Sequence, residues 1–321
     1  MSDEIRVMAL ARRDRREAQS FAREAGISRV YNDYRQLLRD QEVEAVLTAV
    51  PIELNGTVLL DAIRAGKHVL AEKPIAATLR QARAIVRESA RRRQVVLIGE
   101  NFRYRRDLAT AKDLIGRGAI GTVFAFQLTV KFDLGAKARQ RWISRGWRKQ
   151  ARHIGGFVLD AGIHPVAALR DVLGEVSELS AHVLDTSSLI NGPDSALMQV
   201  LMTSGAVGHC FFSYTVKEQR EVPIDFSIFG SHGVLRVVQG TITLTRRVGG
   251  LQRMLKVPEP DGGYSREWED FCRAIHDKKS VLSTPAQAYE DLLVIDAALR
   301  SSARGNRVRT LGSRAKRPPE N

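Results

Sequence analysis

The sequence predicts two joined parts: an α/β part with a parallel sheet, then an α+β part with an open, mostly antiparallel sheet. Over roughly the first hundred residues, short apolar strand signals alternate with helix signals, an order typical of βαβ units. Most of the remaining chain is a series of β-rich, often alternating runs separated by turns, which is typical of antiparallel strands. The length of 321 residues also suits two domains.

The expected strands of the parallel sheet are short apolar runs suited to burial. They are Ile5–Ala11, Arg29–Tyr31, Ala45–Val50, His68–Ala71 and Gln94–Gly99. The helices expected after the first four carry apolar residues at helical spacing. They are Asp14–Ala25, Tyr34–Arg39, Thr57–Ala65 and Leu79–Arg92. A helix between successive strands is the connection that parallel neighbours require.

The second part is expected to contain mostly β-strands. They are Thr122–Phe132, Val176–Leu184, Ala196–Met202, Val207–Thr215, Ile224–Phe229, Val234–Val238 and Ile242–Arg246. The expected helices are Asp107–Arg117, Ile163–Leu173, Arg266–Asp277 and Pro285–Ala303. We therefore predict domains at residues 1–103 and 104–305, with the last helix packed back on the first domain, and a basic tail at 306–321.

Composition excludes several classes of protein. With 44% hydrophobic and 27% charged residues, the chain is not predicted to be disordered. Its apolar runs are far shorter than the roughly 18 residues of a membrane span, and Met1–Glu4 has no features of a signal peptide. Cys210 and Cys272 give neither a disulfide framework nor a metal-binding spacing. No metal is therefore expected, and the cytoplasm is the expected compartment.

The charge balance is strongly basic, with 50 Lys and Arg against 36 Asp and Glu and a net charge of +14. Lys137–Arg152 and Arg300–Arg317 each carry seven basic residues and no acidic one. No helix-turn-helix, zinc-finger or RNP-type pattern accompanies them, so specific nucleic-acid binding is not expected. A solvated cationic surface facing an anionic cofactor is the preferred interpretation, with binding of an anionic polymer as an alternative.

The segment Ala65–Pro74 is the first cluster of residues suited to chemistry. Lys73 comes directly after a buried strand, at the carboxyl end where open α/β sheets bind ligands. Pro74 fixes the turn and favours an extended backbone at Lys73. A lysine partly desolvated beside a cofactor can have its pKa lowered enough to exchange a proton near neutrality. An ordinary loop lysine is the alternative.

The segment Gly155–His164 is the second such cluster. Asp160 and His164 are four residues apart at an expected helix start, so both side chains can lie on one face. A carboxylate and an imidazole together can orient hydroxyl groups and relay a proton. The alternatives are a helix N-cap for Asp160 and an ordinary helix histidine for His164.

Both clusters, in this order, resemble the glucose–fructose oxidoreductase/inositol dehydrogenase (Gfo/Idh/MocA) family, from about Arg6 to Arg309. The motifs are Thr48–Pro51, Ala65–Pro74, Asn101–Tyr104, Gly155–His164, Phe229–Leu235, Trp268–Ile275 and Asp291–Gly305. Members of this family are nicotinamide-dependent enzymes with a Rossmann domain and a C-terminal open antiparallel sheet. The resemblance therefore implies an NAD(P)-dependent oxidoreductase that acts on the hydroxyl or carbonyl group of a sugar or cyclitol.

The resemblance also implies the roles of individual residues. Lys73 is implied as the acid/base group, with Asp160 and His164 contacting the reacting hydroxyl. Cofactor contacts are implied for Thr48, Val50, Pro51, Asn55, Glu72, Lys73 and Asn101. Residues lining the sugar side of the cleft are implied to be Arg103, Tyr104, Trp147 and Arg148. A homo-oligomer formed through the C-terminal sheet is implied as well.

The chain departs from the family pattern in two places. Asn55 stands where members usually carry a histidine, so a proton relay at this position is not expected. No Gly-x-Gly-x-x-Gly turn precedes Asp14, and one βα unit of about 30 residues is expected to be missing, through loss or through a misplaced start. The strands Ile5–Ala11 and Ala45–Val50 then either pair directly or leave apolar edges exposed. A non-catalytic ligand-binding or scaffold protein that has lost pyrophosphate binding is therefore the alternative function.

Arg12 and Arg13 indicate which dinucleotide is expected. They follow the strand Ile5–Ala11, where NAD enzymes place an acidic residue on the ribose 2′-hydroxyl. An arginine at this position suits a 2′-phosphate, so NADP is expected in preference to NAD. A pair of surface arginines is the alternative.

Overall fold

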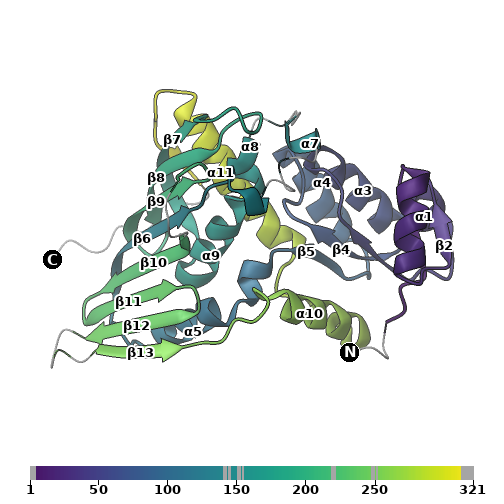
Figure 1. Ribbon diagram of the computed structural model, residues 1–321. Helices are drawn as coiled ribbons and strands as arrows, with labels where there is room; N and C mark the ends of the chain where they lie inside the picture. The colour runs from purple at the N-terminus through teal and green to yellow at the C-terminus, as the bar shows by residue number, and fades with distance from the viewer. Residues whose placement is uncertain are drawn as a thin grey trace.

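The computed structural model describes residues 5–139, 143, 146–149, 153, 155–217, 222–246, 250 and 252–311. Parts of both basic segments, most of the expected basic tail and residues 1–4 lie outside these ranges. An α/β part and a part built on a large sheet lie side by side (Figure 1). Within the described ranges, no helix is both long enough and apolar enough to cross a membrane.

The first part alternates strands and helices as predicted. Its strands are β1 (Ala9–Ala11), β2 (Arg29–Tyr31), β3 (Ala45–Thr48), β4 (His68–Glu72) and β5 (Val96–Gly99). The helices that follow the first four strands are α1 (Arg15–Glu24), α2 (Tyr34–Arg39), α3 (Ile52–Arg64) and α4 (Leu79–Ser89). Every strand pair is parallel. The predicted parallel α/β architecture is thereby confirmed.

Local sequence signals set the helix boundaries. Asp14 and Thr78 cap α1 and α4, each accepting a hydrogen bond from a backbone N–H three residues further on. Gly66 follows the end of α3 with a φ of 75°, which only glycine adopts readily. The start of α3 at Ile52 lies before the expected start at Thr57, because the Asn and Gly between them weaken the helix signal.

The parallel strands form two sheets instead of one. In the described part of the chain, β1 pairs only with β2, and β3 pairs only with β4 in the sheet β3-β4-β5. Of the two outcomes expected for β1 and β3, direct pairing is therefore not observed. Val7, just before β1, is 63% exposed and Leu47 in β3 is 59% exposed. Since strands inside a parallel sheet are normally buried on both faces, these two strands leave apolar edges open.

The second part is built on a nine-stranded sheet, in the order β13-β12-β11-β10-β6-β9-β8-β7-β14. Its strands are β6 (Val123–Lys131), β7 (Val176–Leu184), β8 (Ser195–Met202), β9 (Val207–Ser213), β10 (Val222–Gly230), β11 (Gly233–Val238), β12 (Thr241–Arg246), β13 (Gln252–Lys256) and β14 (Arg309–Thr310). Only β6 and β9 run parallel, so the predicted open and mostly antiparallel sheet is confirmed. The sequence analysis missed β13 and β14, because one is mostly polar and the other has two residues.

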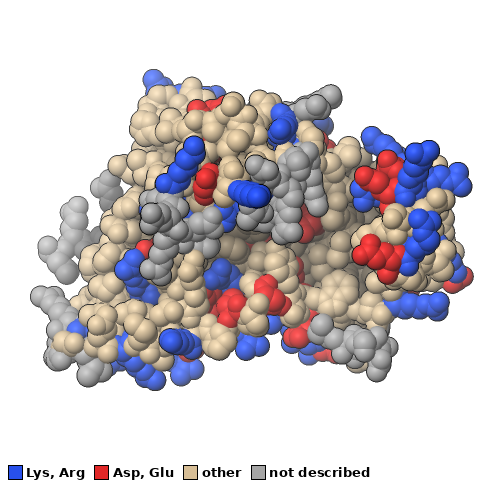
Figure 2. Space-filling model, in the orientation of Figure 1, with Lys and Arg blue, Asp and Glu red and all other residues tan. Residues whose placement is uncertain are grey.

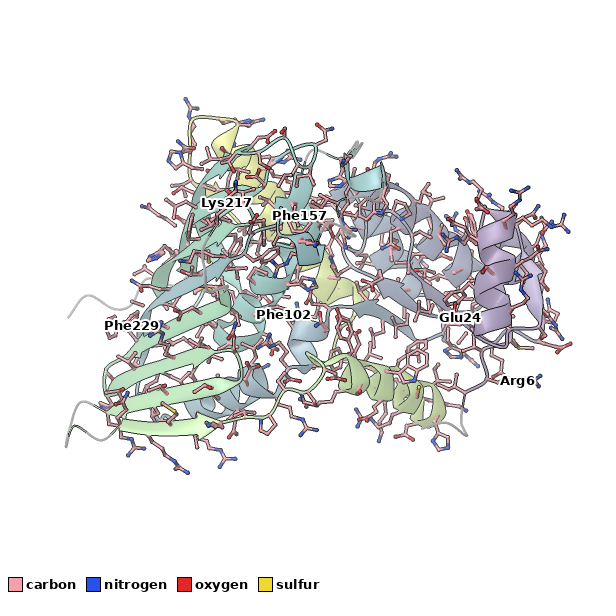
Figure 3. All side chains as sticks on the ribbon, viewed as in Figure 1. Arg6, Glu24, Phe102, Phe157, Lys217 and Phe229 are labelled. Atoms are coloured by element: carbon pink, nitrogen blue, oxygen red, sulfur yellow. The ribbon has the colours of Figure 1, made fainter. Side chains whose placement is uncertain are left out.

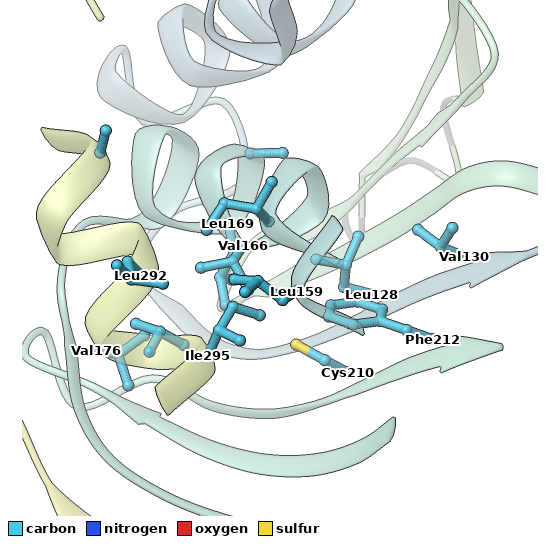
Figure 4. Packing of buried hydrophobic residues seen from close by; sticks show 14 of the residues in the cluster. Leu128, Val130, Leu159, Val166, Leu169, Val176, Cys210, Phe212, Leu292 and Ile295 are labelled. Carbon is cyan, nitrogen blue, oxygen red and sulfur yellow. The ribbon is translucent and has the colours of Figure 1, made fainter. Parts of the chain in front are cut away.

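Helices cover one face of this sheet. The helical elements of the second part are η1 (Asn101–Tyr104), α5 (Arg106–Gly116), η2 (Lys137–Arg139), α7 (Gly146–Lys149), α8 (Gly156–Asp160), α9 (Ile163–Leu173), α10 (Tyr264–Asp277) and α11 (Pro285–Ser302). Four of them, α5, α8, α9 and α11, contact its strands. Leu128, Cys210 and Phe212 of the sheet pack among apolar side chains of α9 and α11 (Figure 4). On the other face, Leu197 and Val207 are exposed.

The end of the chain ties the two parts together. Phe271 in α10 packs with Leu70 and Leu97 of the parallel sheet. The backbone N–H of Ile98 in β5 donates to the carbonyl of Ser283, at 3.0 Å. Helix α11 packs against α4 of the first part as well as α9 of the second. These contacts hold the carboxyl ends of β4 and β5 close to α8 and α9.

Candidate active site

Lys73 lies directly after β4 and meets Asp160, the last residue of α8. Its Nζ donates to the backbone oxygen of Asp160 at 2.6 Å and to Oδ1 of the same residue at 2.9 Å. The side chains are 15% and 7% exposed, respectively. The structure therefore brings together one residue from each cluster that the sequence singled out.

Asn55 holds the turn that presents Lys73. This residue of α3 is 1% exposed, and its Nδ2 donates to the backbone oxygens of Glu72 at 2.6 Å and Pro74 at 2.8 Å. Both amide hydrogens are therefore used within the protein. In this structure the Asn55 side chain positions the Lys73 turn, and the cofactor contact implied for this residue stays a prediction.

Asp160 contacts a second cation from α7. The Nε of Arg148 donates to Oδ2 of Asp160 at 2.7 Å, and the guanidinium lies over the Trp147 ring, 4.2 Å from its centroid. Trp147 and Arg148, which the resemblance placed on the sugar side, are therefore next to the Lys73–Asp160 pair. The carboxylate of Asp160 lies between two cations.

The charges at this pair shift both pKa values. Burial lowers the pKa of Lys73, but the charge and hydrogen bond of Asp160 outweigh it, and the net shift is upward. Burial raises the pKa of Asp160, but Lys73 and Arg148 hold it well below its usual range. The expected lowering of the lysine pKa is therefore wrong, because Asp160 binds the ammonium directly. Lys73 is a protonated donor at neutral pH.

His164 lies on a different helix from Asp160. The predicted single helix start is instead the end of α8 and the start of α9, with Gly162 between them. A side chain on Gly162 would meet the Val158 backbone oxygen at 2.2 Å, so only glycine fits this junction. The change of helix turns His164 toward Glu100, with 2.7 Å between its Nδ1 and Oε1 of Glu100.

Glu100 is a site residue that the sequence analysis missed. Glu72 of β4 pairs with Gly99 of β5, so Lys73 and Glu100 occupy the next positions on neighbouring strands. Glu100 is 1% exposed. A polar residue directly after a buried strand is the signal that identified Lys73, and it applies equally to Glu100. The Lys73–Asp160 and Glu100–His164 pairs thus meet at one sheet edge.

The site lies where the two parts of the molecule join. Phe102 from η1 and Phe157 from α8 lie at this junction, whereas Glu24 of α1 lies at the far end of the first part (Figure 3). The Phe102 ring stacks on the His164 imidazole, with 4.9 Å between centroids. Both parts of the chain therefore contribute to the site.

Arg103 and Tyr104 do not line this site. Arg103 is 4% exposed, and its Nη2 donates to both carboxylate oxygens of Asp291 in α11, at 2.7 and 2.6 Å. The Tyr104 hydroxyl donates to Oδ2 of Asp270 in α10 at 2.8 Å, and the residue is 3% exposed. In this structure both polar groups tie η1 to the helices α10 and α11 and not to the Lys73 site, and the sugar-side roles implied by the resemblance stay predictions.

Most residues implied as cofactor contacts lie along the carboxyl edge of β3, β4 and β5. Thr48 and Glu72 end their strands, while Val50 and Pro51 form the turn into α3. Pro51 occupies the N-cap of α3 and supplies no side-chain acceptor there. Buried Asn101 donates a 2.8 Å hydrogen bond to a backbone oxygen in the loop before α10. The positive end of α3 at this edge fits an anionic dinucleotide.

Arg12 and Arg13 lie at the carboxyl end of β1, on the exposed surface. The Arg12 side chain is 49% exposed and pairs with Glu17 of α1, whose side chain is 58% exposed. An exposed pair of this kind is weak and can be replaced by another anion. The position therefore fits either a 2′-phosphate contact or a pair of surface arginines.

Glu267 in α10 is a second buried carboxyl group near this edge that the sequence analysis missed. It is 5% exposed, and burial, reinforced by the charges of Glu100 and Glu72, raises its pKa to about 9. Its Oε1 has no hydrogen-bond partner among the described residues. Glu267 is therefore protonated at neutral pH.

The other charged groups of the described residues bear on two questions, a metal site and a basic surface. No group of three or more His, Cys, Asp or Glu residues in the described ranges is arranged to hold a metal ion. On the face shown in Figure 2, the described Lys and Arg side chains are scattered, with Asp and Glu among them. This face does not favour binding of an anionic polymer.

Comparisons with known proteins agree with this fold. Residues 1–100 match the family described as "Oxidoreductase family, NAD-binding Rossmann fold", and residues 108–236 match the "GFO/IDH/MocA C-terminal domain". An uncharacterized oxidoreductase of Rhizobium meliloti is 30% identical over 88% of this chain and 74% of its own length. Levoglucosan dehydrogenase of Pseudarthrobacter phenanthrenivorans is 26% identical over 88% of this chain and 84% of its own.

A solved structure shows the same fold over almost the whole chain. An oxidoreductase from Thermotoga maritima is 32% identical, with a TM-score of 0.85, and the match covers 95% of this chain and 90% of that one. The two family matches lie on the two parts of the structure described above. The chain belongs to the GFO/IDH/MocA family of oxidoreductases.

Proposed function

We propose that this protein transfers a hydride between NADP and a hydroxyl or carbonyl carbon of a sugar or cyclitol. The observation that carries the proposal is the Lys73 ammonium, held by Asp160 at the carboxyl edge of the parallel sheet. A relative that is named a levoglucosan dehydrogenase supports a sugar-like substrate. When bound, the nicotinamide ring supplies or accepts the hydride.

Lys73 moves the proton in this proposal. In the reduction direction its ammonium donates a proton to the carbonyl oxygen as the C–H bond forms, and in oxidation the neutral amine accepts the hydroxyl proton. Asp160 keeps the ammonium charged between turnovers. Arg148 and Trp147, beside the same carboxylate, orient the substrate, and His164 contacts the reacting oxygen.

Cofactor binding is the first test. We expect protein fluorescence to change saturably with NADPH, and Arg12→Ala with Arg13→Ala to weaken NADPH binding more than NADH binding. Equal affinity for both cofactors, unchanged by these substitutions, would reject NADP selectivity. Absence of saturable binding of either cofactor would instead support the non-catalytic alternative.

Turnover is the second test. Lys73→Ala is expected to lower kcat by roughly 10²-fold or more, because the proton then has no acceptor or donor. Lys112→Ala is the matched control, since Lys112 pairs with Asp171 on the surface of the second part. Unchanged kcat in Lys73→Ala would reject the acid/base role.

We further propose that one more parallel strand lies between β1 and β3 in the functional protein. The unpaired edges of these strands, together with the exposed Val7 and Leu47, support this proposal. Translation of the DNA preceding Met1 tests it. A strand and Gly-x-Gly-x-x-Gly turn in frame there would supply the pyrophosphate site, whereas a stop codon immediately before Met1 would reject it.

The exposed face of the nine-stranded sheet is proposed to form a homo-oligomer. Leu197 and Val207 are 44% and 53% exposed on neighbouring strands of this face. Exposed apolar patches of this kind mark protein interfaces. Light scattering is expected to show an oligomer that Leu197→Glu with Val207→Glu dissociates. A monomeric wild type would contradict the proposal.

The cytoplasm is proposed as the compartment. Cys210 is a buried cysteine with a free thiol. Free thiols are typical of proteins in reducing compartments. Fractionation of the source cells, with detection of the protein by antibody, is expected to find it in the cytoplasmic fraction, and recovery from an extracellular fraction would contradict this.

A further inference from the structure

Glu100 and His164 share a hydrogen bond at the site, and its hydrogen lies on one of these two side chains. The two groups are 2.7 Å apart, and the same Oε1 of Glu100 accepts from the backbone N–H of Phe102 at 3.2 Å. The side chain of Glu100 is 2% exposed and that of His164 is 19% exposed. The imidazole thus has one buried nitrogen contact, and part of its ring reaches solvent.

The charged groups around Glu100 make it a hydrogen-bond acceptor. The cations and the imidazole are Lys73 after β4, Arg103 in η1 and His164 in α9. The carboxyl groups are Glu72 in β4, Glu267 in α10 and Asp291 in α11. Burial raises the pKa of Glu100, but His164, Arg103 and Lys73 outweigh it and bring the pKa below its ordinary value. The shared hydrogen therefore belongs to Nδ1 of His164.

With a hydrogen on Nδ1 and none on Nε2, the imidazole has an acceptor at Nε2. The ring has little freedom to change this arrangement, because Phe102 stacks on it at an interplanar angle of 22°. Lys73 and Glu100 follow adjacent positions of β4 and β5, and the negative charge of Glu100 acts on the Lys73 ammonium. Lys73 thus offers a hydrogen-bond donor, and Nε2 of His164 a hydrogen-bond acceptor, at the carboxyl edge of the parallel sheet.

We propose that Glu100 is a positioning residue that fixes the Nδ1–H tautomer of His164, so that Nε2 accepts a hydrogen bond from the reacting hydroxyl group of the substrate. The proposal rests on the proposed function for the identity of the substrate group. A carboxylate that sets the tautomer of a histidine in this way is a general device of acid–base sites. Glu100 itself touches neither substrate nor cofactor in this account.

The tautomer can be measured without any ligand. Two-dimensional ¹⁵N–¹H NMR of the imidazole rings at neutral pH is expected to show His164 with its hydrogen on Nδ1. His68 is an internal reference of opposite form, because its Nδ1 accepts from the Val95 backbone N–H at 2.9 Å. Burial lowers the pKa of His68 and keeps it neutral. His164→Gln identifies the signal by removing it.

Two variants of Glu100 separate positioning from a structural role. Glu100→Ala removes the acceptor and is expected to lose the Nδ1–H signal and about 10- to 100-fold of kcat, a loss typical of such orienting partners. Glu100→Gln keeps an acceptor oxygen and is expected to retain both the tautomer and most of the turnover. NADPH affinity is expected to stay within about twofold in both variants.

Each outcome decides the proposal. A wild-type His164 with its hydrogen on Nε2, or a Glu100→Ala variant with unchanged tautomer and kcat, would overturn it. If the wild type shows the Nδ1–H form but no turnover of sugars or cyclitols, the proposed function fails and the assignment of Glu100 as the tautomer-setting group stands. If Glu100→Ala does not fold, the wild-type and Glu100→Gln spectra still decide the result.

Discussion

Two carboxylates in this molecule each lie between two cations, and they differ in what surrounds them. Asp160 contacts Lys73 and Arg148, whose side chains are 15% and 20% exposed. Asp291 contacts Arg103 and Arg170, whose side chains are 3% and 1% exposed. One cluster therefore lies at a sheet edge that solvent reaches, and the other is sealed between α9, α11 and η1.

The cations of the two clusters also differ in chemistry. Arginine is not deprotonated in proteins, whereas lysine exchanges its proton when its surroundings change. The Asp291 cluster can therefore only hold η1, α9 and α11 together. The Asp160 cluster contains the one group, Lys73, that can give and take a proton. The reactive cluster therefore differs from the structural one in two ways: its cations are partly exposed to solvent, and one of them can exchange its proton.

The largest expected effect comes from breaking the sealed cluster. Asp291→Ala leaves the guanidinium groups of Arg103 and Arg170 buried without this partner, and we expect a loss of about 3–5 kcal/mol of unfolding free energy. Chemical denaturation measures this loss. Asp296→Ala is the control on the same helix, because its pair with exposed Arg300 contributes at most about 1 kcal/mol. If both substitutions lower the unfolding free energy equally, the buried cluster contributes no more to stability than an exposed ion pair.

Removal of the charge of Asp160 is expected to shift the pH dependence. Asp160 raises the pKa of Lys73, so Asp160→Asn is expected to lower that pKa. Oxidation needs the neutral amine, so the rising limb of kcat/KM for oxidation against pH is expected to move to lower pH. An unmoved limb would show that Asp160 does not control the proton of Lys73.

Glu267 extends the comparison to a buried carboxyl group without an ion pair in the described ranges. Its pKa in the folded protein is about 9, against an ordinary value of 4.5. Between these values the folded state binds one more proton than the unfolded state, so stability falls as pH rises, by about 1.4 kcal/mol per pH unit.

Glu267→Gln removes this pH dependence. The unfolding free energy of the variant minus that of the wild type is the quantity to compare. This difference is expected to be about 2.7 kcal/mol larger at pH 8 than at pH 6. Denaturation at the two pH values measures it. If the difference in unfolding free energy is the same at pH 6 and pH 8, Glu267 is ionised in the folded protein.

The smallest expected effect comes from Asn55. Asn55→Ala leaves the backbone oxygens of Glu72 and Pro74 without their side-chain donor, and we expect a loss of about 1–2 kcal/mol of stability. Because the turn also places Lys73, kcat is expected to fall while the Kd for NADPH changes little. A variant that loses cofactor binding instead would place Asn55 on the cofactor.

The sequence predicts the fold well where the signal is local. Short apolar runs and apolar residues at helical spacing indicate both the elements and their order. The two separate parallel sheets are predicted only as one of two outcomes, because pairing between distant strands leaves no local signal. Lys73 is found because its place after a buried strand depends on local sequence alone.

The contacts of Arg103 and Tyr104 could not be predicted from the sequence, for a physical reason. A polar side chain next to a site motif has the same chemistry whether it contacts a substrate or a carboxylate far along the chain. Only the fold shows that Arg103 meets Asp291 and that Tyr104 meets Asp270. Glu100 was accessible to sequence reasoning, because the rule that identified Lys73 applies to it.

A paired substitution tests the difference between the two clusters most directly. Lys73→Met and Arg103→Met each remove one cation and leave the carboxylate with one arginine. We expect Lys73→Met to lower kcat by roughly 10²-fold with little change in Tm. Arg103→Met is expected to lower Tm by roughly 5 °C or more, with kcat nearly unchanged at temperatures where it is folded. Full turnover in Lys73→Met, or an equal loss of kcat in both variants, would contradict the account.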